Sequence, residues 1–252
     1  MPMRFSLRIL GTAALVAHIM SLSASDRISG QTPREQPRSG GHSRTLLPDG
    51  RELHVGGWRD GRPAGTIRIV DARAGTTTEL PVQLRTPRAG HTATVLPDGS
   101  VLIFGGEGIG GSLNGVAELF DPASASVNTV GIEGASRRAH HTATVLPDGR
   151  VLVAGGRSAT GDVLSTIEIL DPSTGRVSLV DGTLPMGRSH HSAALTGDGR
   201  VRLSGGVDAS GDPMTEWDVI YDLASGIVAP EARVAAPGAS ADPSEPVDAA
   251  AR

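Results

Sequence analysis

The sequence alternates short apolar runs with turn-forming residues, and one such unit occurs four times. Its clearest copy runs from His141 to Gly156, where HTATVL and RVLVA flank Pro-Asp-Gly. Both runs are rich in β-branched and aliphatic residues, which favour strands. Proline, aspartate and glycine fit successive positions of a tight turn, with glycine in the left-handed conformation. The unit therefore predicts a β-hairpin that ends in a glycine pair.

The hairpin unit recurs with a period of about fifty residues. Copies begin at His42, His91, His141 and His191. A period of this length with four strands per unit is typical of propeller blades. We therefore predict an all-β fold with four blades, at about 42–80, 91–130, 141–180 and 191–229. The glycine pairs are predicted to be structural, since they suit close backbone approach or positive φ; they are Gly56-Gly57, Gly105-Gly106, Gly155-Gly156 and Gly205-Gly206.

Each unit continues past its glycine pair with a variable loop, a third strand and a weaker fourth strand. Val151 to Ala154 is apolar throughout, which predicts a strand covered on both faces. In the third strand of the same unit, Ile167 and Ile169 alternate with Glu168, as in a half-exposed strand. The third strands are predicted to end at an aspartate, namely Asp71, Asp121, Asp171 and Asp222.

The two ends of the chain differ from the repeats in composition. Residues 1–24 begin with Arg4 and Arg8, continue with the apolar run Ile9 to Met20, and offer small residues for cleavage. This pattern predicts a secretory signal peptide, with an uncleaved membrane anchor as the alternative, and hence a secreted, periplasmic or extracellular protein. The polar residues 25–41 predict a linker, and residues 230–252, rich in Ala, Pro, Ser and Asp, predict a disordered tail.

Composition excludes several kinds of chemistry. The net charge of −4 gives no reason to expect a nucleic-acid partner. The chain has no cysteine, which excludes disulfides, thiolate metal sites and a cysteine nucleophile. The segment from Gly106 to Gly111 formally satisfies GxGxxG, but a loop and a strand follow it rather than a helix. We find no GxSxG, HExxH or P-loop, and therefore expect no enzyme, no catalytic residue, no metal and no cofactor.

With these motifs in place, the units resemble kelch repeats, in the bacterial form also seen in the central domain of galactose oxidase. The resemblance covers about residues 38–229 and implies a propeller of four-stranded blades. The copper-radical chemistry of galactose oxidase needs a cysteine-linked tyrosine and a second tyrosine, whereas this chain has no cysteine and only Tyr221. Besides the glycine pair and the aspartate, the matching feature is an arginine three residues before the histidine, at Arg88, Arg138 and Arg188.

The chain departs from the kelch pattern in two respects. Kelch propellers generally close with six or seven blades, and only four are recognisable here. We therefore expect an incomplete arc; a closed four-blade ring, a truncated product and an assembly completed by a second chain are the alternatives. Kelch units also usually carry a tryptophan six residues after the aspartate, where this chain has Thr77, Val127, Val177 and Val228.

The repeated histidines and arginines are the candidate binding residues. Imidazoles at equivalent radius could bind a metal or an anion, and guanidinium groups could bind carboxylates or sugars. The structural alternative is that each histidine hydrogen-bonds a neighbouring blade and each arginine pairs with a blade acid, Glu118 or Glu168. Symmetric recurrence favours the structural alternative, because an active site normally breaks symmetry. The candidates are Arg88, Arg138, Arg188, His91, His141 and His191.

Function is expected to lie in the variable loops that follow the second strands. Trp58, in the first loop, is a candidate for stacking on a sugar. We predict a non-catalytic binding or scaffold protein that recognises a protein or a glycan, with self-association that completes the propeller. The alternatives are a carbohydrate-active enzyme with its site at the channel mouth and a truncated fragment without function. The four loops are Trp58 to Gly65, Glu107 to Gly115, Arg157 to Leu164 and Val207 to Met214.

Overall fold

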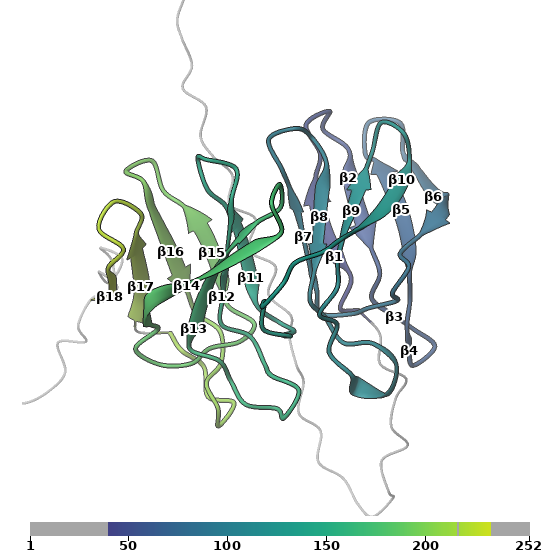
Figure 1. The fold of residues 1–252 in the computed structure, drawn as a ribbon. Helices are drawn as coiled ribbons and strands as arrows, with labels where there is room; N and C mark the ends of the chain where they lie inside the picture. The colour runs from purple at the N-terminus through teal and green to yellow at the C-terminus, as the bar shows by residue number, and fades with distance from the viewer. Residues whose placement is uncertain (1–39, 216, 233–252) are drawn as a thin grey trace, which may run out of the picture. The chain divides into compact units, whose positions relative to one another are not determined.

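The computed structural model describes residues 40–215 and 217–232 of the 252-residue chain. The predicted signal peptide, nearly all of the predicted linker and residues 233–252 of the predicted tail lie outside this part. The described residues form four antiparallel four-stranded sheets, arranged as a four-blade propeller (Figure 1). The predicted all-β fold is confirmed. Within these ranges, no helix is both long and apolar enough to cross a membrane.

Within each blade, the four strands pair in the order in which they occur along the chain, and in blade 1 the short hairpin β3–β4 intervenes between the second and third of them. Blade 1 contains β1 (Ser43–Leu46), β2 (Glu52–Val55), β5 (Thr66–Asp71) and β6 (Thr76–Gln83). Blade 2 contains β7 (Thr92–Val95), β8 (Val101–Phe104), β9 (Ala117–Asp121) and β10 (Ser126–Val130). Blade 3 contains β11 (Thr142–Val145), β12 (Val151–Ala154), β13 (Thr166–Asp171) and β14 (Arg176–Thr183). Blade 4 contains β15 (Ser192–Leu195), β16 (Arg200–Ser204), β17 (Trp217–Asp222) and β18 (Val228–Ala232).

The predicted turn connects the first two strands of every blade. In blade 3, Gly149 has φ 85°, and Asp148 Oδ1 accepts a hydrogen bond of 3.1 Å from the Arg150 backbone N–H. The third strands end at the predicted aspartates, whose carboxylates cap the next turn in the same way. At Asp171, hydrogen bonds from the Ser173 and Thr174 side chains and amides lower the carboxyl pKa to about 2. The aspartate of the Pro-Asp-Gly turn is thus a turn former, as predicted, and the aspartate that ends the third strand caps a second turn.

The core lies between the blades, in three apolar clusters. One joins blades 1 and 2, one joins blades 2 and 3, and one joins blades 3 and 4. Every residue of β8 and β12 is buried, because each of these strands lies between two neighbouring blades. The small residues that replace the usual kelch tryptophan still contribute, since Val127, Val177 and Val228 all pack in or against these clusters.

Backbone hydrogen bonds also join consecutive blades near their first strands. The Gly90 N–H donates to the Gly41 carbonyl (2.8 Å), the His140 N–H to Gly90 (2.8 Å), and the His190 N–H to His140 (3.0 Å). These four residues all have positive φ, which is why glycine occupies the position twice. The described residues contain no equivalent bond between His190 and Gly41, so this series stops at blade 4.

The repeats extend slightly beyond the predicted boundaries. Strand β18 continues to Ala232, inside the region predicted as tail. Gly40, predicted to lie in the linker, pairs with Trp58 in an antiparallel bridge. Both additions follow from pairing with a neighbouring strand, which the composition of these segments does not reveal.

Candidate functional site

The repeated arginines lie at the bases of the second, third and fourth variable loops. The Arg88 side chain is fully buried, and its Nη2 lies 2.6 Å from Glu118 Oε1. Its Nη1 donates to the carbonyl oxygens of Gly105 (3.0 Å) and Val116 (2.9 Å). These two carbonyls flank the loop of blade 2, so one guanidinium closes both ends of that loop. Burial lowers the pKa of Arg88 from its ordinary value, and the Glu118 charge opposes this shift.

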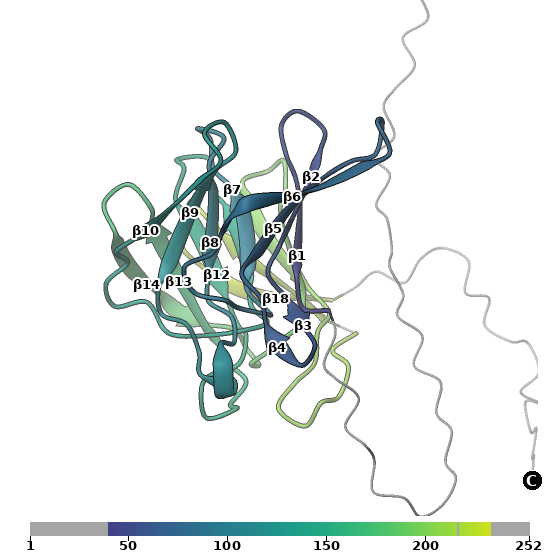
Figure 2. The same ribbon diagram turned by 90° about the vertical axis from the view of Figure 1, so that its right-hand side faces the viewer.

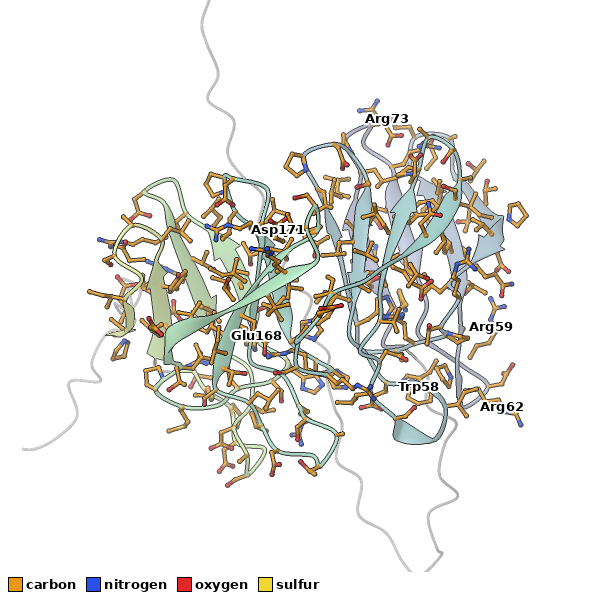
Figure 3. The ribbon with its side chains drawn as sticks, in the orientation of Figure 1. Trp58, Arg59, Arg62, Arg73, Glu168 and Asp171 are labelled. Carbon is orange, nitrogen blue, oxygen red and sulfur yellow. The ribbon has the colours of Figure 1, made fainter. Side chains whose placement is uncertain are left out.

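Blade 3 repeats the arrangement. Arg138 Nη2 lies 2.7 Å from Glu168 Oε1, and Nη1 donates to the carbonyls of Gly155 (2.9 Å) and Thr166 (3.4 Å). Glu168 also accepts a hydrogen bond from the Ser136 backbone N–H at 3.2 Å. Glu168 is buried in blade 3, where it is labelled in Figure 3. Both ion pairs are those of the structural alternative for these arginines.

Blade 4 keeps the arginine but loses the glutamate. By strand register, Val219 occupies the position that Glu168 has in blade 3. The Arg188 side chain is buried, and its Nη1 donates to the Gly205 carbonyl at 3.4 Å. Its Nε has no hydrogen-bond partner among the described residues. Burial lowers the pKa of Arg188, and the nearby charge of Asp218 opposes this shift.

The repeated histidines join one blade to the next. His91, His141 and His191 are buried, and each Nε2 lies 2.9–3.1 Å from a hydroxyl of the preceding blade. Burial lowers the pKa of His91 and His191 to about 3, and lowers that of His141 well below its ordinary value. Nearby arginines add to the shift in each case. The imidazoles are therefore neutral near pH 7. The hydroxyl partners are those of Ser43, Thr92 and Thr142.

The glycine pairs leave room for these histidines. A Cβ added at Gly105 would lie 2.4 Å from the Arg138 carbonyl oxygen and 2.5 Å from His141 Cε1. The same close approach occurs at Gly56 and Gly155, and all three residues have positive φ. Only glycine fits such a position without strain.

The four variable loops have the same base and different tips. At each base, the N–H of the last loop residue or its neighbour donates to the carbonyl of the second glycine of the pair at 2.8–2.9 Å. The tips are exposed and lie at the end of the blades opposite the Pro-Asp-Gly turns (Figures 1 and 2). The exposed tip segments are residues 59–62, 109–112, 159–162 and 209–213.

The loop tips differ in chemistry from blade to blade. The first carries Arg59 and Arg62, and the second carries Ile109, which is 74% exposed. The third and fourth tips are acidic, with Asp162 and Asp212. A constant frame that presents different side chains is the arrangement of a recognition surface. We call these four tips together the loop face.

A known protein family matches the chain over most of its length. The domain described as the KLHDC2/KLHL20/DRC7 Kelch-repeats domain matches residues 19–225, well over half of the chain. The chain belongs to the Kelch-repeat family. This kelch propeller is thus of a kind that commonly serves as a protein-interaction scaffold and is typically not an enzyme. No curated protein matches the chain significantly.

Within the kelch propeller, the predicted binding residues fall into two groups. The three arginines and three histidines are buried and bonded inside the blades, so they do not belong to the loop face. Trp58 does lie beside it, but not in a loop as predicted. It begins a short hairpin of β3 (Trp58–Arg59) and β4 (Arg62–Pro63), in which Trp58 pairs with Pro63 and Arg59 pairs with Arg62 (Figure 3). The side chain is partly exposed.

Sequence reasoning missed a second group, close to the inner ends of the loops. His140 and His190 stack with ring centroids 4.1 Å apart, and His140 Nε2 lies 3.4 Å from Glu107 Oε1. The His190 side chain is exposed. Burial lowers the pKa of His190, and the charges of His140 and Arg157 lower it further. The charge of Glu107 opposes this shift. The doubled histidine in HH was the available signal, and both His140 and His190 have positive φ.

The part of the chain that the structure describes contains no group of three or more His, Asp or Glu residues suited to a metal ion. The stacked imidazoles and Glu107 are polar and at least partly exposed. Together with the loop face, they form the candidate binding surface of this kelch propeller.

Proposed function

We propose that this kelch propeller is a non-catalytic scaffold that binds a partner protein through the loop face. The observation that supports this most strongly is the contrast between the loop bases and the loop tips. All four bases are held by a repeated backbone hydrogen bond, and those of the second and third loops also by a buried ion pair, whereas the tips are exposed and differ in charge and polarity. A rigid surface of this kind loses little conformational freedom when a partner binds.

The chemistry of the loop face favours a polypeptide partner of mixed character. The exposed apolar side chain of Ile109 lies on the second tip, among polar and charged tips. The first tip carries Arg59, Asp60 and Arg62, whereas the third and fourth carry Asp162 and Asp212, so the net charge of the tips changes from basic to acidic along the blades. A partner with the reverse order of charges would be oriented by this pattern.

A glycan is the second candidate ligand. The partly exposed Trp58 indole supports it, because aromatic rings contact sugars, and Arg59 and Arg62 of the same hairpin offer guanidinium donors. We also propose that the protein is secreted, on the basis of the charged start and apolar run within residues 1–24. Fractionation of cells that express the full chain would test secretion, and retention in the cytoplasm would contradict it.

The test of the loop face replaces each tip in turn by glycine and serine and measures partner capture from the extracellular fraction. We expect a loss of capture of about tenfold or more for at least one tip, with unchanged thermal stability. The matched control replaces Ser173 and Thr174, which are exposed in a turn at the other end of blade 3. Unchanged capture after all four replacements would contradict the proposal, and glycan turnover by the wild-type protein would favour the enzyme alternative.

A further inference from the structure

We propose that the outer faces of blades 1 and 4 bind each other between two copies of the chain and close a ring of eight blades. The two faces carry the two halves of a junction that occurs three times inside the chain. Neither half has a neighbouring blade within the described residues. The inference goes beyond partner binding, because it concerns the blade faces rather than the loop face.

Each internal junction has the same three parts. A backbone N–H at the start of the later blade donates to the residue at the same position in the earlier blade. The later blade's histidine meets a hydroxyl of the earlier blade's first strand. The same imidazole covers the first glycine of the earlier blade's glycine pair.

Blade 4 carries the earlier-blade half without a later blade against it. A Cβ added at Gly205 would meet nothing closer than 4.0 Å, whereas at Gly155 it would lie 2.4 Å from the next arginine carbonyl. Ser192, equivalent to Thr142, is exposed and donates to the Ser204 carbonyl of its own blade. The site that receives a histidine in blades 1, 2 and 3 is thus open in blade 4.

Blade 1 carries the later-blade half. His42, equivalent to the buried His91, His141 and His191, is exposed and stacks on His54 of its own blade, with ring centroids 5.5 Å apart. Gly41 is equivalent to the donors Gly90, His140 and His190, and it is exposed. Blade 1 therefore offers the histidine and the backbone N–H that blade 4 lacks.

The facing side chains are charged at the two ends and complementary in sign. In β8, β12 and β16, the residues facing the preceding blade are apolar, but in β2 they are Glu52 and His54. In β2, β8 and β12, the residues facing the next blade are apolar, but in β16 they are Arg202 and Ser204. A junction between blade 4 and blade 1 would therefore bring Arg202 toward Glu52.

The third strands repeat this complementarity. Arg68 of blade 1 stands where blades 2 and 3 have Glu118 and Glu168, and its Nε is buried without a hydrogen-bond partner in the described residues. Asp218 of blade 4 is nearly buried and occupies the outward position, where blade 3 has Ile167. Within one chain, Arg202 interacts with Glu231 (3.0 Å) and Asp218 (3.9 Å), and Glu52 with Arg44 (2.8 Å).

A second copy is the occupant that fits both faces. The chain's own blade 1 does not fill the open site, since no described hydrogen bond joins His42 or Gly41 to blade 4. Two copies satisfy both ends at once, because each blade 4 then meets the blade 1 of the other copy. The assembly is closed, and it leaves no sheet face of the repeats uncovered.

The test uses charge reversal on the full chain, with mass measured by light scattering. We expect the wild-type protein to show about twice the chain mass of 25.8 kDa, and to dissociate at high salt, because charge pairs at a surface are screened. Glu52→Arg alone and Arg202→Glu alone should each raise the dissociation constant at least about tenfold, since like charges then face each other twice per ring. Arg176→Glu, on the exposed outer strand of blade 3, is the matched control and should leave the mass unchanged.

Mixing the two single variants gives the decisive result. One mixed pair contains two junctions of opposite charge, so mixing should restore the doubled mass. A monomeric wild-type protein, a series of larger masses, or a pair insensitive to both variants would overturn the proposal. If both substitutions combined in one chain restored the doubled mass but mixing the single variants did not, blades 4 and 1 of the same chain would be the ones that meet. That result would also overturn the proposal.

Discussion

At the scale of single residues, burial decides the role of the repeated arginines and histidines. A ligand could reach Arg88 only by opening the loop base that this residue closes. Moving a charged group into the protein interior costs several kcal/mol unless it is paired, and Glu118 supplies the pairing at 2.6 Å. The arginines thus act on binding indirectly, by fixing the loops that present the tips.

The first prediction concerns the Arg88–Glu118 pair. Arg88→Met leaves the Glu118 carboxylate buried without its cation, and we expect the free energy of unfolding to fall by about 3–5 kcal/mol. Urea denaturation measures the change. Arg176→Met, at an exposed site, should change stability by less than about 0.5 kcal/mol. Adding Glu118→Gln to Arg88→Met should recover part of the loss, and a single-variant loss below about 1 kcal/mol would count against this role of the pair.

The second prediction concerns pH. His91 and His191 have a folded-state pKa of about 3, against an ordinary value of 6.5, so the unfolded state binds more protons between these values. Their contribution to stability is complete above pH 6.5 and is lost as the pH falls toward 3. Each histidine should contribute a slope of up to about 1.4 kcal/mol per pH unit below pH 6.

Urea midpoints measured from pH 7 to pH 4.5 test this slope, in a range above the titration of the capping aspartates. His91→Gln should destabilise the protein at pH 7 and also reduce the slope by one histidine's contribution. A stability that does not change between pH 6.5 and pH 4.5 would show that the imidazoles are accessible to protons in the folded state.

At the scale of elements, each junction depends on a glycine that a histidine covers. Gly105 and Gly205 are equivalent and have nearly the same φ, 69° and 67°. They differ in their surroundings, because His141 and the Arg138 carbonyl cover Gly105, while Gly205 has no close neighbour. Alanine substitutions at Gly205 and at Gly105 therefore separate two contributions to the loss of stability. The first measures the cost of the backbone conformation alone, and the second adds the cost of a steric clash.

We therefore predict that Gly205→Ala lowers the free energy of unfolding by about 1–2 kcal/mol, the cost of a left-handed conformation for a non-glycine residue. Gly105→Ala should cost at least about 2 kcal/mol more, because its Cβ also meets backbone that cannot move independently. Chemical denaturation of dilute protein measures both. Equal losses would show that junctions in this propeller relax to admit a side chain.

Strands and turns were largely predictable because their causes are local. The Pro-Asp-Gly turn and the third strands that end at aspartate follow from residues within ten positions of each other. Partners across a junction were less accessible. The sequence suggested Glu118 as a partner for the arginines, but not the carbonyls of Gly105 and Val116, since backbone contacts leave no trace in residue type. His140 and His190 were adjacent to predicted candidates, and only the fold stacks them.

At the scale of the whole propeller, the repeats divide the chain into a rigid part and a variable part. The strands, the junction histidines and the loop bases repeat from blade to blade, while the tips do not. The polar residues at Glu52 and Arg202 break the repeat at its two ends. Both residues could be read from the sequence. Only the strand register shows that Glu52 faces outward from the first blade and Arg202 outward from the last.

In this propeller, hydrogen-bonded blades hold exposed loop tips in fixed positions. Amide hydrogen exchange of the full chain, resolved by residue, tests it most directly. We predict that the amides of Gly90, His140 and His190, which join the blades, exchange only through global unfolding, while those of Gly61 and Gly110 at the tips exchange freely. Exchange of the three junction amides as fast as that of the tips would contradict the account.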